Sequence, residues 1–362
     1  MKVLCIGDAM IPGVDLAESA SALGTTEVVA TDWERDWSGL QHRRLVVEQR
    51  GPAAEPVPDA FADHRDADVG LGLFAPWSAE GMDRFEQLRL IGVARAGVEN
   101  VDLAAATERG ILVLNVLGRN AEAVSDYTVG MILAEARNIA RSHAAISAGQ
   151  WRKEFSNSAF VPELHGKTIG IVGFGHIGQL VARKLGGFQV RVLAFDPFAS
   201  PDALAAAGAH AATLDQLLRE SDVVTLHARL TPESQGLIGR DELAKMQPTA
   251  YLVNTARSGL VDGDALVDAL REQRIAGAAL DVFDREPLAE GDPLLELDNV
   301  TLTSHLAGTT REALTRSPEL LVGAVRDVLA GRPSPSLRNP EVLDRTDVRG
   351  WLESTRTTDG AA

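Results

Sequence analysis

The chain has 362 residues, 45% of them hydrophobic and 24% charged, which is the composition of a folded globular protein with room for two domains. Its formal net charge of −16 argues against nucleic acid or an anionic membrane as a partner, because both are polyanions. The single cysteine, Cys5, excludes an intramolecular disulfide and fits a reducing cytoplasm, and no apolar run is long enough to cross a membrane.

The N-terminal third predicts an α/β layer. Residues 2–7 have the pattern of a buried strand, and the run is too short for the core of a signal peptide. Further strands are expected at 27–30, 69–74, 90–94 and 111–114, with helices at 14–23, 78–88 and 103–109. Residues 31–64 interrupt this alternation with a charged helical pattern and a proline-rich run. We expect them to form an insertion or surface excursion, with Trp33 and Trp37 packed beneath it.

The middle and C-terminal parts predict a second alternation of strands and helices. Asn120 is placed to cap one continuous helix over 121–148, which at 1.5 Å per residue would span about 40 Å and could run from one domain into the next. Strand candidates follow at 168–172, 190–195, 222–226, 250–253, 275–280 and 300–302. Alternation of this kind favours doubly wound parallel sheets. Residues 306–330 are expected to be helical, and the tail from Arg332, with three prolines in eight residues, is expected to be a loosely held extension.

One stretch carries a nucleotide-binding pattern. Residues 168–178 read as strand, tight turn and helix, and the turn has the spacing G-x-G-x-x-G at Gly173, Gly175 and Gly178. The first glycine permits the bend, the second lets the backbone approach a pyrophosphate, and the third lets the helix lie close to the strand. The pyrophosphate would rest on the free N–H groups at the helix N-terminus, around His176 and Ile177. Three glycines could fall at these spacings by chance, but the flanking strand and helix argue against that.

The next strand ends in Asp196, eighteen residues beyond Gly178. A carboxylate at this place accepts hydrogen bonds from the hydroxyls of an adenosine ribose and repels a 2′-phosphate. The sequence therefore favours NAD over NADP.

Ionisable residues follow three of the later strands: Arg257, Asp281 with Glu286, and His305. Ligands of open α/β sheets bind at the carboxyl ends of strands. Together these groups could support hydride transfer at the carbon of a 2-hydroxy acid. His305 would exchange the hydroxyl proton, Glu286 would orient the imidazole and favour its charged form, and Arg257 would bind the carboxylate. Taken singly, each residue could equally be an ordinary surface or turn residue.

The chain resembles the D-isomer-specific 2-hydroxyacid dehydrogenases, in particular the phosphoglycerate dehydrogenase-like branch. The resemblance covers about residues 88–320 and rests on five motifs: residues 95–102 (RAGVENVD), 173–178 (GFGHIG), 254–262 (NTARSGLVD), 279–288 (ALDVFDREPL) and 304–308 (SHLAG). It implies an enzyme in which Arg257, Glu286 and His305 are catalytic, Asp281 lies near the nicotinamide carboxamide, and Thr255, Ala256 and Gly308 add cofactor contacts. No metal ion is expected at such a site.

The resemblance also implies a domain plan. Residues 1–118 with 308–340 would form a discontinuous substrate domain, 119–307 an NAD-binding Rossmann domain, and 341–362 a C-terminal extension. Both domains would be doubly wound α/β sheets, Rossmann-like or flavodoxin-like, with a cleft between them. Family members are commonly homodimers through the NAD domain, and the partner molecule would be a small 2-hydroxy or 2-oxo acid.

The chain departs from the family pattern where the substrate would bind. The family loop is Gly-x-Gly-x-Asp, whereas Arg95, Ala96, Gly97, Val98 and Glu99 stand here, and Arg119 directly precedes the helix at Asn120. The usual proline two residues after His227 is also replaced. If Arg95 and Arg119 point to solvent, they say nothing about the substrate. Turned inward with Arg257, Arg95 and Arg119 supply more positive charge than one carboxylate needs, and would indicate a sugar acid or a phosphorylated acid.

Two alternatives remain open. A protein of the same scaffold could sense NAD(H) and recruit partners, as corepressors resembling this family do. A relative of formate dehydrogenase is the other alternative, although that branch carries glutamine where Glu286 stands.

Overall fold

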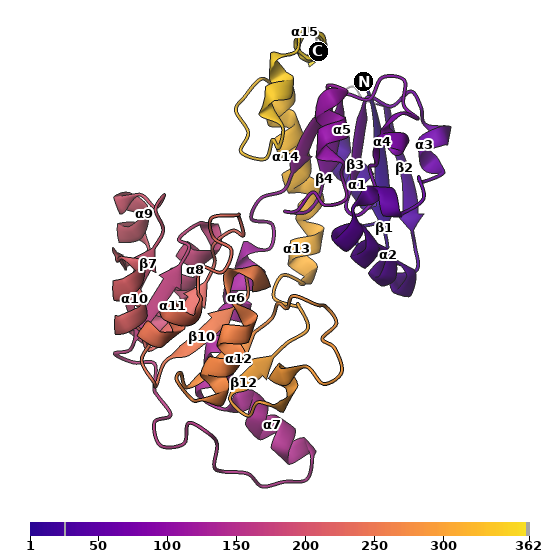
Figure 1. Ribbon diagram of the computed structural model, residues 1–362. Coiled ribbons are helices and arrows are strands. Elements are labelled where there is room, and N and C mark those ends of the chain that lie inside the picture. The colour runs from indigo at the N-terminus through magenta and orange to yellow at the C-terminus, as the bar shows by residue number, and fades with distance from the viewer. Residues whose placement is uncertain (25–26, 360–362) are drawn as a thin grey trace. The chain divides into compact units, whose positions relative to one another are not determined.

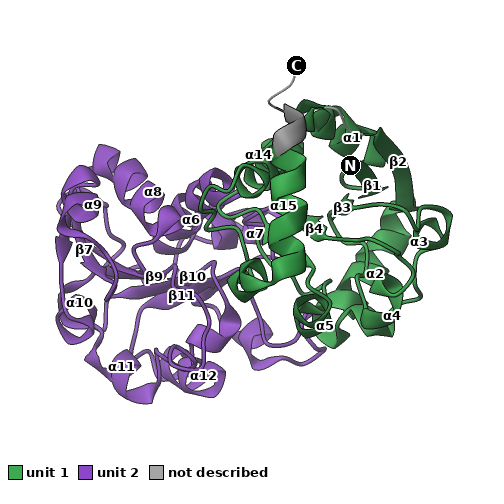
Figure 2. Cartoon of the chain, turned by 90° about the horizontal axis from the view of Figure 1, so that it is seen from above, with its two compact units in different colours: residues 1–119, 310–362 green, residues 120–309 purple. Residues whose placement is uncertain are grey.

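The computed structural model describes residues 1–24 and 27–359 (Figure 1). The chain divides into two compact units: unit 1 is Met1–Arg119 with Thr310–Ala362, and unit 2 is Asn120–Thr309 (Figure 2). No helix among the described residues is both long and apolar enough to cross a membrane.

Unit 1 is built on a five-stranded parallel sheet in the order β2-β1-β3-β4-β5, which is the flavodoxin-like order. The strands are β1 (Lys2–Asp8), β2 (Glu27–Glu34), β3 (Val69–Gly72), β4 (Leu90–Val93) and β5 (Leu112–Asn115). The helices are α1 (Gly13–Ala20), α2 (Trp37–Arg50), α3 (Ala60–Asp63), α4 (Ala79–Met82), α5 (Leu103–Glu108), α13 (Arg311–Thr315), α14 (Ser317–Leu329) and α15 (Thr346–Asp359).

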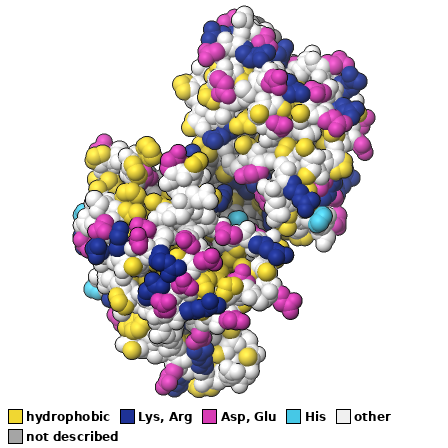
Figure 3. All heavy atoms as spheres, viewed as in Figure 1, with side chains coloured by type: hydrophobic (Ala, Val, Ile, Leu, Met, Phe, Trp, Pro, Cys, Tyr) yellow, Lys and Arg dark blue, Asp and Glu magenta, His cyan; other side chains and the backbone are white. Residues whose placement is uncertain are grey.

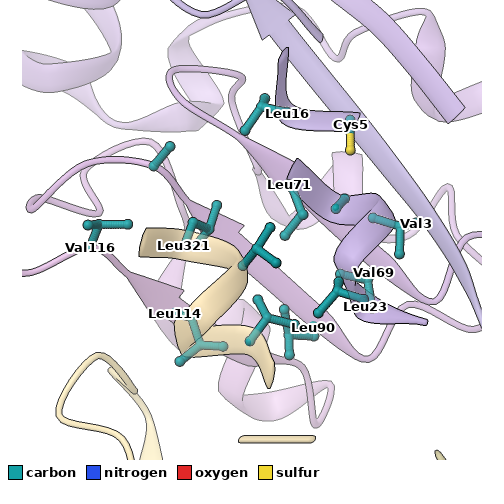
Figure 4. Packing of buried hydrophobic residues seen from close by; sticks show 14 of the residues in the cluster. Val3, Cys5, Leu16, Leu23, Val69, Leu71, Leu90, Leu114, Val116 and Leu321 are labelled. Atoms are coloured by element: carbon teal, nitrogen blue, oxygen red, sulfur yellow. The ribbon is translucent and has the colours of Figure 1, made fainter. Parts of the chain in front are cut away.

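Alternate residues of each strand in unit 1 enter two cores, because side chains of a strand point to opposite faces of the sheet. Val3 and Cys5 pack on one face with Leu321 of α14, as Figure 4 shows. Leu4 and Ile6 pack on the other face, in the core that contains residues of α3, α4 and α5.

Unit 2 is built on a seven-stranded parallel sheet in the order β12-β11-β10-β9-β6-β7-β8. The strands are β6 (Thr168–Val172), β7 (Arg191–Phe195), β8 (Ala209–Ala211), β9 (Val223–Leu226), β10 (Tyr251–Asn254), β11 (Gly277–Leu280) and β12 (Val300–Leu302), and they can be followed in Figure 1 from β7 through β10 to β12. The chain order reverses between β6 and β9. This is the Rossmann arrangement, in which ligands bind at the carboxyl edge beside the reversal.

Helices cover both faces of the second sheet. Residues of α6 and α8 pack on one face with Ile169 and Ile171, and residues of α10, α11 and α12 pack on the other with Val172. The helices are α6 (Ala121–Ala136), α7 (Ile139–Ser147), α8 (His176–Leu185), α9 (Pro201–Ala206), α10 (Leu214–Glu220), α11 (Arg240–Lys245) and α12 (Gly263–Arg271). The predicted fold class of two doubly wound parallel-sheet domains is confirmed.

The prediction that residues 31–64 form an insertion is wrong. Strand β2 continues to Glu34 and contains Trp33, and α2 is the helix that leads from β2 towards β3. Trp33 packs against both cores of unit 1, and the Arg43 guanidinium lies 4.2 Å from the centre of its ring. Only Leu40 and Val47 of α2 are buried, so the sequence of this helix reads as a charged surface segment.

The predicted continuous helix over 121–148 is also wrong. The segment forms α6 and α7, separated at Asn138, whose φ of 58° lies in the left-handed region. Asparagine tolerates this conformation better than most residues, and its side-chain amide donates to Asn157 Oδ1 at 2.8 Å. Both helices belong to unit 2, so neither runs from one unit into the other.

The C-terminal tail is not a loose extension. Leu337 pairs with Leu114 of β5, and the fully buried Asn339 accepts a hydrogen bond from the Val113 N–H at 2.9 Å and donates to the Ile111 carbonyl at 2.8 Å. Val348 and Leu352 of α15 complete the core under α14. The predicted helix over 306–330 is in fact α13 and α14, which meet at Arg316 just before Pro318.

Candidate active site

The glycine turn in unit 2 follows β6 directly. Gly173 has a φ of +91°, and a Cβ there would come within 3.0 Å of the Ala228 backbone. A Cβ on Gly178 would come equally close to the Gly173 carbonyl oxygen, whereas a Cβ on Gly175 would meet no atom of the described residues within 4 Å apart from its chain neighbours. The first and third positions therefore need glycine for the fold, while the second leaves open space in front of the backbone.

Helix α8 begins at His176, immediately after this turn. The N–H groups of its first turn, at His176, Ile177 and Gly178, have no acceptor within the helix, and the helix dipole makes this end favourable for an anion. The open space at Gly175 and these N–H groups fit the pyrophosphate of a dinucleotide.

Asp196 stands at the end of β7, beside the turn. Its Oδ2 accepts from the Phe174 N–H at 2.7 Å and its Oδ1 from the Phe198 N–H at 2.8 Å. These bonds fix the carboxylate next to the glycine turn, and each oxygen can still accept a ribose hydroxyl.

Residues 254–257 follow β10 and form a braced loop. The Asn254 side chain donates to the Arg257 carbonyl at 2.8 Å and accepts from the Ala256 N–H at 3.0 Å. The exposed Arg257 donates only to the Ala256 carbonyl, at 2.7 Å, and no carboxylate of the described chain pairs with it. The Thr255 hydroxyl lies 2.8 Å from the Thr128 hydroxyl of α6, and this hydrogen bond fixes the Thr255 side chain.

Asp281 follows β11 and is fully buried. Its Oδ1 accepts from the Thr303 hydroxyl at 2.6 Å and from the Leu306 N–H at 2.9 Å, and its Oδ2 accepts from the Ala307 N–H at 2.9 Å. The carboxylate thus clamps the loop that carries His305. His305 itself has a φ of 55°, a strained value for a non-glycine residue, and the clamp on both sides holds it there.

His305 and Glu286 form a hydrogen-bonded pair. The distance between His305 Nδ1 and Glu286 Oε2 is 2.7 Å, and the Phe283 N–H donates to the other carboxylate oxygen at 3.0 Å. Glu286 is therefore fixed by the backbone and accepts from the Nδ1–H of the imidazole. Nε2 of His305 has no hydrogen-bond partner within the described part of the chain, and the His305 side chain is 49% exposed.

Gly308 lies beside the start of α6. A Cβ at this position would come within 3.0 Å of the Asn120 side-chain amide, so a larger residue would have to displace that side chain. Asn120 does stand at the N-cap of α6, but its side chain makes no capping hydrogen bond, contrary to the prediction.

The predicted substrate loop of unit 1 follows β4. The Arg95 side chain is only 12% exposed, and its Nη2 lies 2.7 Å from Glu48 Oε1 and 3.2 Å from Glu99 Oε2. The side chain of Glu99 folds back over Gly97, and the Ala96 carbonyl accepts from the Asn115 side chain. Val98 packs against the core behind the loop.

Arg119 follows β5 and is partly buried. Its Nη1 donates to the Ser317 hydroxyl at 3.3 Å. The pKa of Arg119 is lowered to about 10, mainly by burial and also by the charge of Arg95, and the charge of Asp8 opposes both effects. Neither Arg95 nor Arg119 points freely into solvent.

Residues 129–307 match the NAD-binding domain of the D-isomer specific 2-hydroxyacid dehydrogenases. A glyoxylate reductase of Thermofilum pendens is 44% identical over 283 residues, which cover 77% of this chain and 83% of that protein. The chain belongs to the D-isomer specific 2-hydroxyacid dehydrogenase family. It is also 37% identical to a D-3-phosphoglycerate dehydrogenase of Archaeoglobus fulgidus, but covers only 50% of that protein's length.

Solved structures share this fold, among them a putative D-isomer specific 2-hydroxyacid dehydrogenase of Polaromonas sp. JS6 66, with a TM-score of 0.70 at 25% identity over 93% of this chain and 98% of that one. The TT0316 protein of Thermus thermophilus superposes with a TM-score of 0.69 at 34% identity, over 93% of this chain and 99% of that one. The predicted family, the enzyme class of an NAD-dependent oxidoreductase and the NAD cofactor are confirmed.

Sequence reasoning missed several polar residues at the strand ends. Asp8 ends β1 and is buried, which raises its pKa to about 6, and His227 follows β9 with its pKa lowered to about 3 by burial. Arg44 and Glu48 were hidden in the segment interpreted as an insertion. The only signal that could have found Asp8 is its position directly after a predicted strand.

Proposed function

We propose that the protein interconverts a D-2-hydroxy acid and its 2-oxo acid with NAD, and that Arg257, Glu286 and His305 are the catalytic residues. The observation that carries this proposal is the 2.7 Å hydrogen bond between His305 and Glu286 on the same sheet edge as the glycine turn. Strands β12, β11 and β10 are neighbours and parallel, so the loops with His305, Glu286 and Arg257 emerge side by side.

The cofactor would lie along this edge. From β7, which ends at Asp196, to β11 there are four strand spacings, roughly 19 Å at about 4.8 Å each. When bound, oxidised NAD would accept the hydride and NADH would donate it. The residues proposed to contact it are Gly173, Gly175, His176, Ile177, Gly178, Asp196, Thr255, Ala256, Arg257, Asp281, His305 and Gly308.

The protein side chains would handle the proton and the carboxylate. The free Nε2 of His305 takes the proton of the substrate hydroxyl during oxidation and returns it during reduction. Glu286 accepts the Nδ1–H, which fixes the ring orientation and stabilises the imidazolium that forms. Arg257 offers a planar fork of donors to the substrate carboxylate and polarises the adjacent carbonyl.

On unit 1 we assign substrate binding to Arg95, Ala96, Gly97, Val98 and Arg119. Ala96, Gly97 and Val98 would bind the substrate through their backbone amides, as the family resemblance implies. We also propose a cytoplasmic homodimer, for which light scattering of the purified protein is the direct test of the dimer.

The test is a panel of 2-oxo acids incubated with NADH and followed by loss of absorbance at the nicotinamide band. We expect reduction of at least one acid, and Arg257→Lys should be severely impaired because a single ammonium cannot reproduce the two-pronged contact. NADH binding without turnover across a broad panel would instead support the NAD(H)-sensing alternative.

A further inference from the structure

A cluster of arginines lies at the carboxyl edge of the sheet in unit 1. Strands β1, β3, β4 and β5 are parallel, so the residues that follow them emerge at one edge. Phe74, Arg95 and Arg119 come from three of these strand ends, and Arg44 with Glu48 reaches the same edge from α2. We call Arg44, Arg95 and Arg119 with Phe74 the arginine cluster.

The phenyl ring of Phe74 holds two of the guanidinium groups together. The Arg95 guanidinium carbon lies 4.5 Å from the ring centre and that of Arg44 lies 5.9 Å from it, within cation–π distance. Arg119 is close enough to Arg95 for the two positive charges to repel each other. Like charges gathered in this way repel unless an anion lies among them.

The donors of the cluster are incompletely used. Among the described residues, the buried Arg44 Nε and Arg95 Nη1 have no hydrogen-bond partner, and Arg119 has one acceptor, the hydroxyl of Ser317. Buried N–H groups of this kind usually have an acceptor, because leaving one without a partner costs about 1–3 kcal/mol.

The carboxylates nearby do not balance the cluster evenly. Glu48 and Glu99 both pair with Arg95, and within the described ranges no carboxylate pairs with Arg44 or Arg119. The Asp8 carboxylate accepts from the N–H groups of Met10 and Ile11 at 2.8 and 3.1 Å, and its charge acts on Arg119 without an ion pair between the two described side chains.

Glu99 is the partner that can leave. Its side chain is 46% exposed and its oxygen lies 3.2 Å from Arg95, whereas Glu48 is 29% exposed and 2.7 Å away. Glu99 also stands where the family motif has aspartate, one methylene shorter, and its longer side chain folds over Gly97.

We infer that the arginine cluster binds a second oxyanion of the substrate, a phosphate or a further carboxylate, and that Glu99 pairs with Arg95 until this oxyanion replaces it. The inference rests on the proposed function and narrows it to 2-oxo acids that carry an anionic group besides the 2-carboxylate. Three guanidinium groups supply charge-assisted hydrogen bonds from several sides, and the displaced Glu99 carboxylate is hydrated at the surface.

The kinetic test compares four probes with NADH: glyoxylate and pyruvate, which lack the second oxyanion, 2-oxoglutarate, which has a second carboxylate, and phosphohydroxypyruvate, which has a phosphate. We expect a lower KM for one of the latter two. Arg44→Gln and Arg119→Gln should raise that KM about tenfold or more, as for the loss of a hydrogen bond to a charged group, and should raise it further than the KM for glyoxylate. Glu99→Gln should lower it severalfold, because the competing carboxylate is removed.

Arg43→Gln is the matched control. Arg43 neighbours Arg44 on α2 but pairs with Glu34 and Glu55 beneath Trp33, so this variant loses the same charge from the same helix. It should leave all four KM values unchanged. If glyoxylate or pyruvate has the lowest KM and the Arg44 and Arg119 variants behave like Arg43→Gln, the inference is wrong although the proposed function stands.

A second measurement separates the inference from catalysis. Inorganic phosphate should raise the Tm of the full chain, and the shift should be much smaller in Arg119→Gln than in Arg43→Gln. Equal shifts in the two variants contradict an oxyanion site in the arginine cluster. A differential shift without turnover of any 2-oxo acid would support the site and refute the proposed function.

Discussion

The glycine turn allows a prediction that separates folding from cofactor binding. Gly175 and Gly178 are three residues apart, yet an added methyl group meets open space at the first and the Gly173 carbonyl oxygen, within 3.0 Å, at the second. Gly178→Ala should therefore push α8 away from the turn. Overpacking of this kind costs about 1–3 kcal/mol, which for a unit of this size lowers the Tm by several degrees.

Gly175→Ala should have the opposite profile. The methyl group projects into the space proposed for the pyrophosphate, so the free energy of unfolding should change little in the absence of cofactor. Loss of one backbone hydrogen bond to a charged phosphate is worth about 1.5–3 kcal/mol, so the Kd for NADH should rise about tenfold to a hundredfold.

The assay measures thermal unfolding without cofactor and NADH binding by fluorescence for both variants in parallel. A Gly175→Ala protein that binds NADH as tightly as the wild type would refute the placement of the pyrophosphate at this turn. A Gly178→Ala protein with wild-type Tm would refute the packing argument.

Three further predictions concern the cofactor, the pH dependence of stability and the tail. Asp196→Ala should narrow the preference for NAD over NADP, measured as the ratio of kcat/KM values, because the carboxylate no longer repels a 2′-phosphate; an unchanged ratio would contradict this role. Burial raises the pKa of Asp8 from 3.8 to about 6, so the folded state favours the neutral acid, and the stability that Asp8 contributes is lost as the pH rises from about 4 to 6. Asp8→Asn should remove this dependence and raise the free energy of unfolding at pH 7 by up to about 3 kcal/mol; a lower value at pH 7 would contradict the reasoning. Asn339→Ala should destabilise unit 1 by about 2–4 kcal/mol in denaturant unfolding, because it leaves the buried Val113 N–H and Ile111 carbonyl without partners, and an unchanged midpoint would show that the tail is not docked.

The sequence was most informative where local pattern and packing agree. The apolar runs of β6 and β10 are buried on both faces of a parallel sheet, so they stand out from their surroundings. The residues that follow such strands include Asp196, Arg257 and His305, and the parallel order of the strands brings them to one edge.

The sequence was misleading where the structure depends on distant partners. The left-handed Asn138 is held by Asn157, nineteen residues away, and nothing in the helical periodicity of 121–148 reports that contact. Asn339 reads as a polar residue in a proline-rich tail, although it bonds to the backbone of β5, more than 220 residues earlier. Arg95 likewise pairs with Glu48, which lies on α2. Because only two residues of α2 are buried, its sequence does not indicate that this helix packs beside Arg95.

Surface charge gives little guidance to the site. On the face shown in Figure 3, acidic and basic side chains are interspersed, without one broad basic region. Arg257, Arg95 and Arg119, which we propose to bind the substrate, are distinguished by their positions after strands and by their hydrogen-bond partners. Local geometry is therefore a better guide than the net charge of −16.

The central claim is that His305 exchanges the substrate proton, and its most direct test is single-site substitution with cofactor binding measured beside turnover. His305→Ala should lower kcat by about a hundredfold to ten-thousandfold while the Kd for NADH changes far less, because the imidazole acts mainly on the substrate hydroxyl and many other residues are proposed to contact the cofactor. His210→Ala, at an exposed histidine on β8 of the same unit, is the matched control and should retain wild-type kcat. A His305→Ala enzyme that reduces a 2-oxo acid at the rate of the His210→Ala control would contradict the account.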